Sequence, residues 1–72
     1  MDPYEKLANA IVLLAAKDYR SALKRLKKYP SDREAKAAVW ALERFFRSGW
    51  YSVLTSVDGE YLIENLRKEV LE

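Results

Sequence analysis

Residues 4–29 read YEKLANAIVLLAAKDYRSALKRLKKY, a stretch that contains neither proline nor glycine. Apolar side chains recur along it at intervals of three and four residues, first over 4–14 and then over 15–29. Such spacing places these side chains on one face of an α-helix. The two sets meet at adjacent positions, so the apolar stripe drifts around the helix without interruption. The stretch therefore predicts one long amphipathic helix, and this helix decides the fold.

Signals at both ends of this stretch define where the helix begins and ends. Asp2 followed by Pro3 provides an N-cap acceptor and a proline at the first helical position. Pro30 cannot continue the helix. We therefore predict a helix over about 3–29, which at 1.5 Å per residue would be about 40 Å long. The alternative is a break near Asp18, with Asp18 as a second N-cap.

A second helix follows after a very short connection, so it should lie antiparallel to the first. Ser31 and Glu34 have the spacing of a capping box, and Gly49 is a typical residue at a helix C-terminus. These signals predict a helix over about 32–48. Its apolar face consists of Ala35, Ala38, Val39, Leu42, Phe45 and Phe46. We expect both phenylalanines of that face to be buried.

Two shorter segments complete the chain. Residues 50–55, WYSVLT, are rich in β-branched and aromatic side chains, which also suits a strand. A lone strand would have no partner, so we predict a short linking helix there. Asp58 is the expected N-cap of a last helix over about 58–70, with Ser56 as the alternative cap. The apolar edge of this helix consists of Leu62, Ile63, Leu66 and Val70. The sequence thus predicts an all-α fold: a single helical domain over 1–72, a small bundle of three main helices and a short linking helix.

The composition excludes several kinds of chemistry. The chain has 72 residues, and neither cysteine nor histidine is among them. Disulfides, thiolate or imidazole metal sites, and catalysis that requires cysteine or histidine are therefore excluded. Asp58, Glu60 and Glu64 are expected to serve as helix caps and dipole partners rather than as a catalytic or metal site. We predict that the protein is not an enzyme, with no cofactor, metal ion or small-molecule substrate.

The hydropathy pattern predicts no association with a membrane. The longest apolar run, 10–16, is far shorter than the ~20 residues that span a bilayer. Absence of cysteine suits a reducing compartment. The expected location is the cytoplasm.

Charge is unevenly distributed along the chain. The net charge is +2, but residues 17–36 carry +5 and residues 58–72 carry −3. On a helix, five cations of the first segment share one face: Lys17, Arg20, Lys24, Lys27 and Lys28. Such a stripe suits a nucleic-acid backbone or an acidic protein partner. The solvated outer face of a soluble helix is the simpler interpretation. Pairing between the basic and acidic segments, within or between chains, is a further expectation.

Two adjacent aromatic residues are candidates for an interface. Trp50 and Tyr51 follow a glycine at the predicted end of the second helix, so they are free to point away from the core. Tryptophan and tyrosine are enriched at protein interfaces, and we expect at least one of these rings to be exposed or to lie in a subunit interface. The first helix should also extend beyond its neighbours, and a two-fold homodimer would cover that overhang.

Two stretches of the sequence resemble known proteins: 4–26, YEKLANAIVLLAAKDYRSALKRL, and 41–69, ALERFFRSGWYSVLTSVDGEYLIENLRKE. Together they resemble short uncharacterised helical proteins encoded in prophages and mobile elements of gut Firmicutes. The most distinctive part is FFRSGW followed by SVDGEYLI. Gly49 stands where these proteins are expected to have a polar residue. The resemblance implies a bacterial cytosol and a small accessory role in a mobile element, with no established activity, cofactor or catalytic residue.

These observations favour a small non-enzymatic accessory or regulatory protein that acts through protein–protein contacts, as a homodimer or with another protein. The alternative is a nucleic-acid-binding protein that uses the basic face of the first helix. An inhibitor of a host defence enzyme would belong to the first class.

Overall fold

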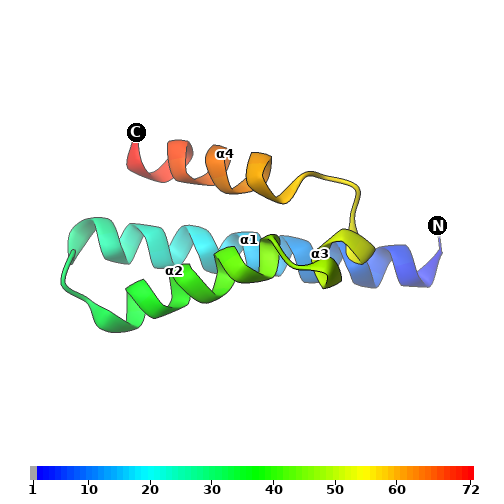
Figure 1. The fold of residues 1–72 in the computed structure, drawn as a ribbon, viewed down its shortest axis with the longest axis horizontal. Helices are drawn as coiled ribbons and strands as arrows, with labels where there is room; N and C mark the ends of the chain where they lie inside the picture. Colours follow the sequence, from blue (N-terminus) through cyan, green and yellow to red (C-terminus); the bar gives the residue numbers. More distant parts are fainter. Residues whose placement is uncertain (1) are drawn as a thin grey trace.

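The computed structural model describes residues 2–72, and in that range it contains four α-helices and no strand. Figure 1 shows them in chain order as α1 (Pro3–Lys28), α2 (Arg33–Phe46), α3 (Gly49–Leu54) and α4 (Gly59–Leu71). The predicted all-α class, with three main helices and a short linking helix, is confirmed. The first helix continues through Asp18, so the alternative of a break at that residue is wrong.

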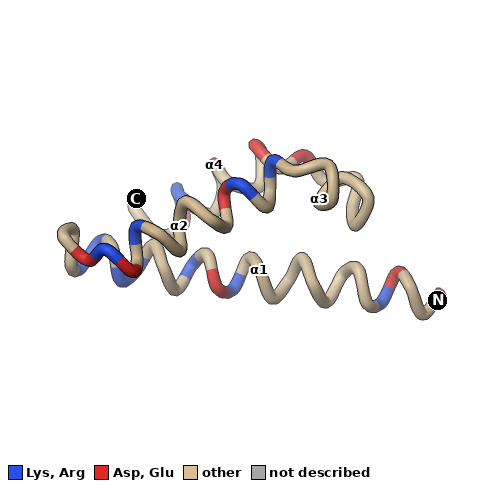
Figure 2. The backbone as a smooth tube through the Cα atoms, turned by 60° about the horizontal axis from the view of Figure 1, so that its bottom comes forward, with Lys and Arg blue, Asp and Glu red and all other residues tan. Residues whose placement is uncertain are grey.

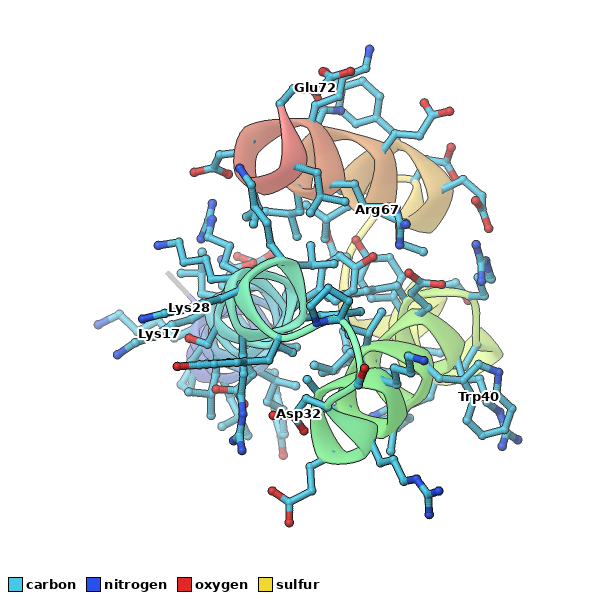
Figure 3. The ribbon with its side chains drawn as sticks, turned by 90° about the vertical axis from the view of Figure 1, so that its left-hand side faces the viewer. Lys17, Lys28, Asp32, Trp40, Arg67 and Glu72 are labelled. Carbon is cyan, nitrogen blue, oxygen red and sulfur yellow. The ribbon has the colours of Figure 1, made fainter. Side chains whose placement is uncertain are left out.

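The longest helix, α1, is the axis of the molecule, which measures 41 × 22 × 18 Å. The second helix returns beside α1 in the opposite direction, and α4 runs back along the same axis after the short α3 (Figure 1). Viewed from the end, α1, α2 and α4 form the three corners of a triangle (Figure 3). Both α2 and α4 are about half as long as α1, so they cover only part of it.

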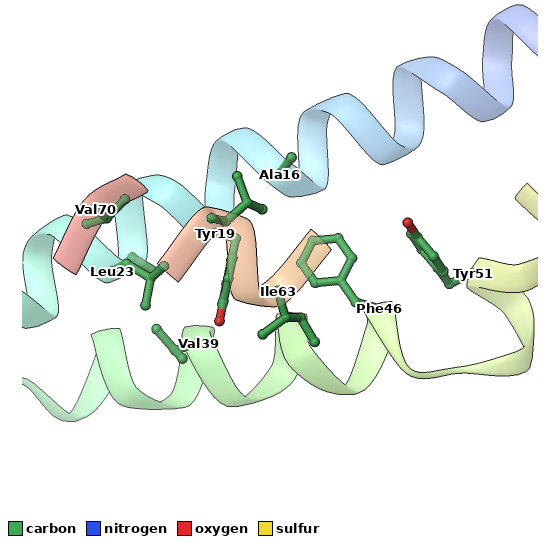
Figure 4. Close-up of a cluster of buried hydrophobic side chains, with 10 residues drawn as sticks. Ala16, Tyr19, Leu23, Val39, Phe46, Tyr51, Ile63 and Val70 are labelled. Atoms are coloured by element: carbon green, nitrogen blue, oxygen red, sulfur yellow. The ribbon is translucent and has the colours of Figure 1, made fainter. Parts of the chain in front are cut away.

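The core lies between α1, α2 and α4. Its largest fully buried side chains are Tyr19, Leu23 and Phe46 (Figure 4). The rings of Tyr19 and Phe46 pack edge to face with their centroids 5.5 Å apart, and Tyr51 packs against Phe46 in the same manner at 5.7 Å. Edge-to-face pairs add to the free energy of ring burial. Phe45 is only half-buried and packs against the edge of this cluster, so its expected burial is incomplete.

The start of α2 differs from the predicted capping box. The N-cap is Asp32, whose Oδ1 accepts the Ala35 backbone N–H at 3.1 Å. Its Oδ2 accepts a hydrogen bond from Arg25 of α1 at 2.5 Å. Ser31 instead lies in the turn that Asp32 N closes onto the carbonyl oxygen of Tyr29. The Asp32 carboxylate is preferred over the Ser31 hydroxyl as the cap because one of its oxygens accepts a backbone N–H of α2 while the other pairs with Arg25 of α1.

The prediction that Gly49 ends the second helix is also wrong. The second helix already ends at Phe46, and Gly49 is the first residue of α3. None of the glycines has a positive φ, so Gly49 is not a left-handed helix terminator. Ser48 makes the transition between the two helices, because its hydroxyl donates to the Phe45 carbonyl at 2.6 Å and accepts from the Tyr51 N–H at 3.2 Å.

The start of α4 depends on a close approach between two backbones. Asp58 occupies the predicted N-cap position, but its side chain makes no capping hydrogen bond. The next residue, Gly59, is buried, and a Cβ atom added there would lie 1.9 Å from the carbonyl oxygen of Phe46. This separation is far below van der Waals contact, so only glycine allows α4 to start against the end of α2.

Alanine substitutions at the two glycines should therefore have opposite effects. Gly59→Ala should lower the free energy of unfolding by about 1–3 kcal/mol, the usual cost of overpacking, because backbone must move. At Gly49 an added Cβ meets nothing within 4 Å, so Gly49→Ala should leave stability unchanged or raise it by up to about 1 kcal/mol. Urea unfolding followed by circular dichroism measures both. Equal stability of the two variants would contradict this account of the α2–α4 junction.

The Asp32 cap predicts a pH dependence. The Ala35 N–H, and to a lesser extent Arg25, hold the pKa of Asp32 below its usual value. A lowered pKa means that the cap stabilises the fold above the unfolded-state pKa and that this contribution is lost as the pH falls through the folded-state pKa. Asp32→Ala should therefore lower the melting temperature at neutral pH, with a smaller difference from wild type in acid. Ser31→Ala is the matched control and should have little effect at either pH.

Candidate functional site

The N-terminal half of α1 is the part of the fold that its neighbours leave uncovered. The buried residues of α1 begin at Ala16, and none of the described residues over 3–15 is buried. In Figure 1 this half of the helix extends past α4, with α3 and the loop that follows it alongside. The apolar periodicity of α1 nevertheless continues through both halves. A stripe that is core in the second half of α1 therefore becomes surface in the first half.

Six side chains make up this surface, which we call the N-terminal apolar face: Tyr4, Leu7, Ile11 and Leu14 of α1, and Trp50 and Val53 of α3. Exposed fractions are 81% for Tyr4, 60% for Leu7 and 58% for Leu14. On α3 they are 61% for Trp50 and 76% for Val53. Ile11 is half-buried between the two helices. Scattered exposed apolar residues are common on proteins, but a contiguous group of this kind is typical of an interaction surface.

The face contains a groove of about 270 Å³ between α1 and α3. Its lining is almost entirely apolar and consists of Tyr4, Leu7, Ala8, Ile11, Trp50, Val53 and Leu54. The lining contains no carboxylate, amine or guanidinium group, and its one hydroxyl belongs to Tyr4. The groove is thus suited to an apolar side chain of a partner.

The middle of this face, over residues 7–16 of α1, carries no charge. Residues 7–16 contain no charged side chain, and the nearest charges along the helix are Lys6 and Lys17. Figure 2 shows this uncharged stretch as a long section of α1 without acidic or basic residues. Ten residues of helix correspond to about 15 Å. Depletion of charge at the centre of a patch is characteristic of protein interfaces.

The two predicted interface aromatics have different positions. Trp50 is exposed on the N-terminal apolar face, whereas Tyr51 is buried against Phe45 and Phe46. Burial raises the pKa of the Tyr51 phenol, and its hydroxyl has no hydrogen-bond partner among the described residues. Tyr51 is therefore a core residue, and the prediction of a free ring applies to Trp50. The remaining indole, Trp40, is also exposed, but Arg44 lies over its ring at 4.8 Å.

The predicted basic face is divided by contacts with α4. Arg20 pairs with Glu69 at 3.0 Å, and Lys27 donates to the Val70 carbonyl at 3.1 Å near the end of α4. Pairing of the basic and acidic segments within one chain therefore occurs. The other three cations of this face are exposed and form no ion pair within residues 2–72: Lys17, Lys24 and Lys28. Figure 3 shows Lys17 and Lys28 extending to the same side of α1.

A carboxylate at the centre of the bundle was not anticipated from the sequence. Glu43 of α2 accepts the Tyr19 hydroxyl at 2.6 Å and Arg67 of α4 at 2.8 Å. Burial, together with the hydrogen bond to Glu43, raises the pKa of Tyr19 to about 12. Glu43 also pairs with Arg47, the C-cap of α2, at 3.5 Å, so all of its partners are side chains of the bundle and its role is structural. An acid beside the apolar face of α2 is the only sequence signal for it.

The three acids near the start of α4 form no centre of their own. Glu60 pairs with Arg47, the C-cap of α2, and this pairing holds the pKa of Glu60 below its usual value. Glu64 is exposed, and Asp58 has the position of a helix cap. Across residues 2–72 no group of three or more acidic side chains is arranged to hold a metal ion. Within the same range, no helix is both long enough and apolar enough to cross a membrane.

Comparisons with known proteins give no relative from which a function can be transferred. No protein-family model, curated protein or solved structure matches this chain. The class that the structure defines is a small helical bundle with one exposed apolar face, and the argument for function depends on that face.

Proposed function

We propose that this protein is a small non-enzymatic interaction module that acts through protein contacts made by the N-terminal apolar face. The observation that carries the proposal is a contiguous, uncharged and exposed apolar surface on a helix whose other half is core. Burial of such surface is the main favourable term in protein association. An accessory role in a mobile element, as the sequence resemblance implies, is part of the same proposal.

Trp50 is the expected anchor of this contact. Its ring is more than half exposed and borders an apolar groove that Tyr4 and Leu7 also line. Tryptophan and tyrosine contribute disproportionately to binding energy at the centre of protein interfaces. Leu7 and Val53 would exclude water around the indole. This arrangement supports binding of an apolar helix or loop of another protein chain.

The proposal predicts which substitutions abolish binding. Immobilised protein is challenged separately with bacterial lysate and with labelled free copies of the chain. Wild type should retain at least one of these, and Leu7→Glu combined with Trp50→Ala should reduce retention at least tenfold, because a charge would be buried in the contact. Circular dichroism checks that the variant is folded.

Leu13→Glu is the matched control. Leu13 is 69% exposed on the same helix, but it does not line the groove, and adjacent helix residues point about 100° apart. Its substitution should leave binding unchanged. Equal retention by all variants, or no retention of either partner by wild type, would overturn the proposal.

A second candidate function is supported by the three exposed cations Lys17, Lys24 and Lys28. Their spacing of seven and four residues places them on one side of α1, away from α2 and α4. A phosphate backbone contacted by three cations would give weak, strongly salt-dependent binding. The overall charge of only +2 makes this support weaker than that for the apolar face.

Titration of labelled duplex and single-stranded DNA at several salt concentrations tests this candidate. Three phosphate contacts predict a slope of roughly −3 for duplex in a plot of log affinity against log salt. Lys17→Glu combined with Lys24→Glu should abolish binding, whereas Arg33→Glu combined with Lys36→Glu, on exposed positions of α2, should weaken it less. Absence of binding at low salt would exclude the candidate.

A further inference from the structure

We propose that the partner of the N-terminal apolar face is a second copy of this chain, and that the two copies pair their α1 helices in antiparallel orientation. This inference rests on the proposed function, in that it requires the face to make protein contacts, and it adds the identity of the partner and the register. Three features of the face support it: the spacing of the exposed residues, the position of one charge and the exposed area.

The spacing of the exposed stripe is that of a helix-pairing seam. Tyr4, Leu7, Ile11 and Leu14 follow one another at intervals of three, four and three residues. This is the a/d pattern by which two helices interlock their side chains. Ala10 lies beside the seam and is exposed, so its small side chain allows a close approach of the second helix on that side, whereas Ala8 on the other side lines the groove against α3.

One charge distinguishes the two orientations of such a pair. Asp18 follows Leu14 by four residues, so it continues the seam on the same side of α1, and it is exposed. Parallel pairing would place the two Asp18 carboxylates opposite each other, which is unfavourable. Antiparallel pairing would instead move the two Asp18 carboxylates to opposite ends of the pair, each near the N-terminal end of the partner α1, where the Asp2 cap and Glu5 already interact with the helix dipole. The position of Asp18 therefore favours the antiparallel orientation.

The same stripe defines the register. A two-fold axis that crosses the seam at the height of residue 9 along α1 brings Tyr4 opposite Leu14 of the other copy and Leu7 opposite Ile11. Each apolar residue of the seam then meets another apolar residue, as a self-complementary two-fold contact requires. Trp50 and Val53 border this seam from α3, because they line the same groove as Leu7 and Ile11.

The exposed area is sufficient for a specific dimer. Aromatic side chains bury roughly 150–250 Å² each, so Tyr4 and Trp50 at their observed exposure offer on the order of 300 Å². Leu7, Leu14 and Val53 offer a similar area, which gives on the order of 600 Å² per copy. Complete burial of both faces would remove ~1,200 Å² from solvent, which reaches the lower limit of specific protein–protein interfaces.

The mass of the protein in solution tests the dimer. Sedimentation equilibrium over a range of concentrations should show twice the chain mass for wild type, and the chain mass for Leu7→Glu combined with Leu14→Glu. Leu13→Glu, with the same chemical change off the seam, should remain dimeric. The circular dichroism signal of the helices identifies any variant that fails to fold. Leu7→Ala removes contact area without adding charge, and it should weaken the dimer at least tenfold.

Crosslinking tests the orientation. The chain has no cysteine, so single-cysteine variants report only on the position chosen. Under mild oxidation, a mixture of Leu7→Cys and Ile11→Cys chains should form mainly the mixed disulfide, because these positions face each other in the antiparallel register. Predominance of the Leu7→Cys homodisulfide would indicate parallel pairing and overturn the inference.

The outcomes separate this inference from the proposed function. A wild type that is monomeric at all concentrations overturns the dimer. If Leu7→Glu combined with Trp50→Ala still abolishes retention of a lysate protein in that case, the proposed function stands. If wild type is monomeric and retains no lysate protein, both fail.

Discussion

Tyr19 joins three helices at one point, and the rest of the bundle is arranged around that junction. Its ring packs on Phe46 of α2, and its hydroxyl donates to Glu43, which also accepts from Arg67 of α4. A half-buried carboxylate is costly unless its hydrogen bonds are satisfied, so this network requires α2 and α4 to meet α1 near residue 19. Since that point lies in the second half of α1, the first half contributes no fully buried residue, and its N-terminal end lies beside α3 and the loop that follows α3.

The close approach at Gly59 has the same consequence from the other end of α4. Contact with the Phe46 carbonyl fixes where α4 begins, and the helix then runs along α1 toward Lys27, whose ammonium group contacts the Val70 carbonyl. Because its start is fixed against α2, α4 cannot shift toward the N-terminal end of α1. The exposed face is thus a result of how the core is built.

Much of this fold could be predicted from residue order, because proline, cap residues and apolar periodicity act locally. Two local predictions were wrong for physical reasons. Ser31 and Asp32 are both good caps, and the choice depends on Arg25, a partner from another helix. Gly49 suits a helix end by itself, but Ser48 caps α3 directly. The candidate face could be predicted only in part, since periodicity shows that α1 has an apolar side and does not show where α2 and α4 stop covering it.

The short α3 connects the core to the candidate face. Adjacent residues of a helix point about 100° apart, so once Ser48 starts α3 and Tyr51 is directed into the core, Trp50 must point outward. Tyr51 closes the end of the core against Phe46, and Trp50 borders the groove with Tyr4 and Leu7. The burial of Tyr51 and the exposure of Trp50 therefore have the same cause, the position at which α3 begins. Any partner that binds the indole also acts on the helix that seals the core, so binding at the N-terminal apolar face should stabilise the fold as a whole.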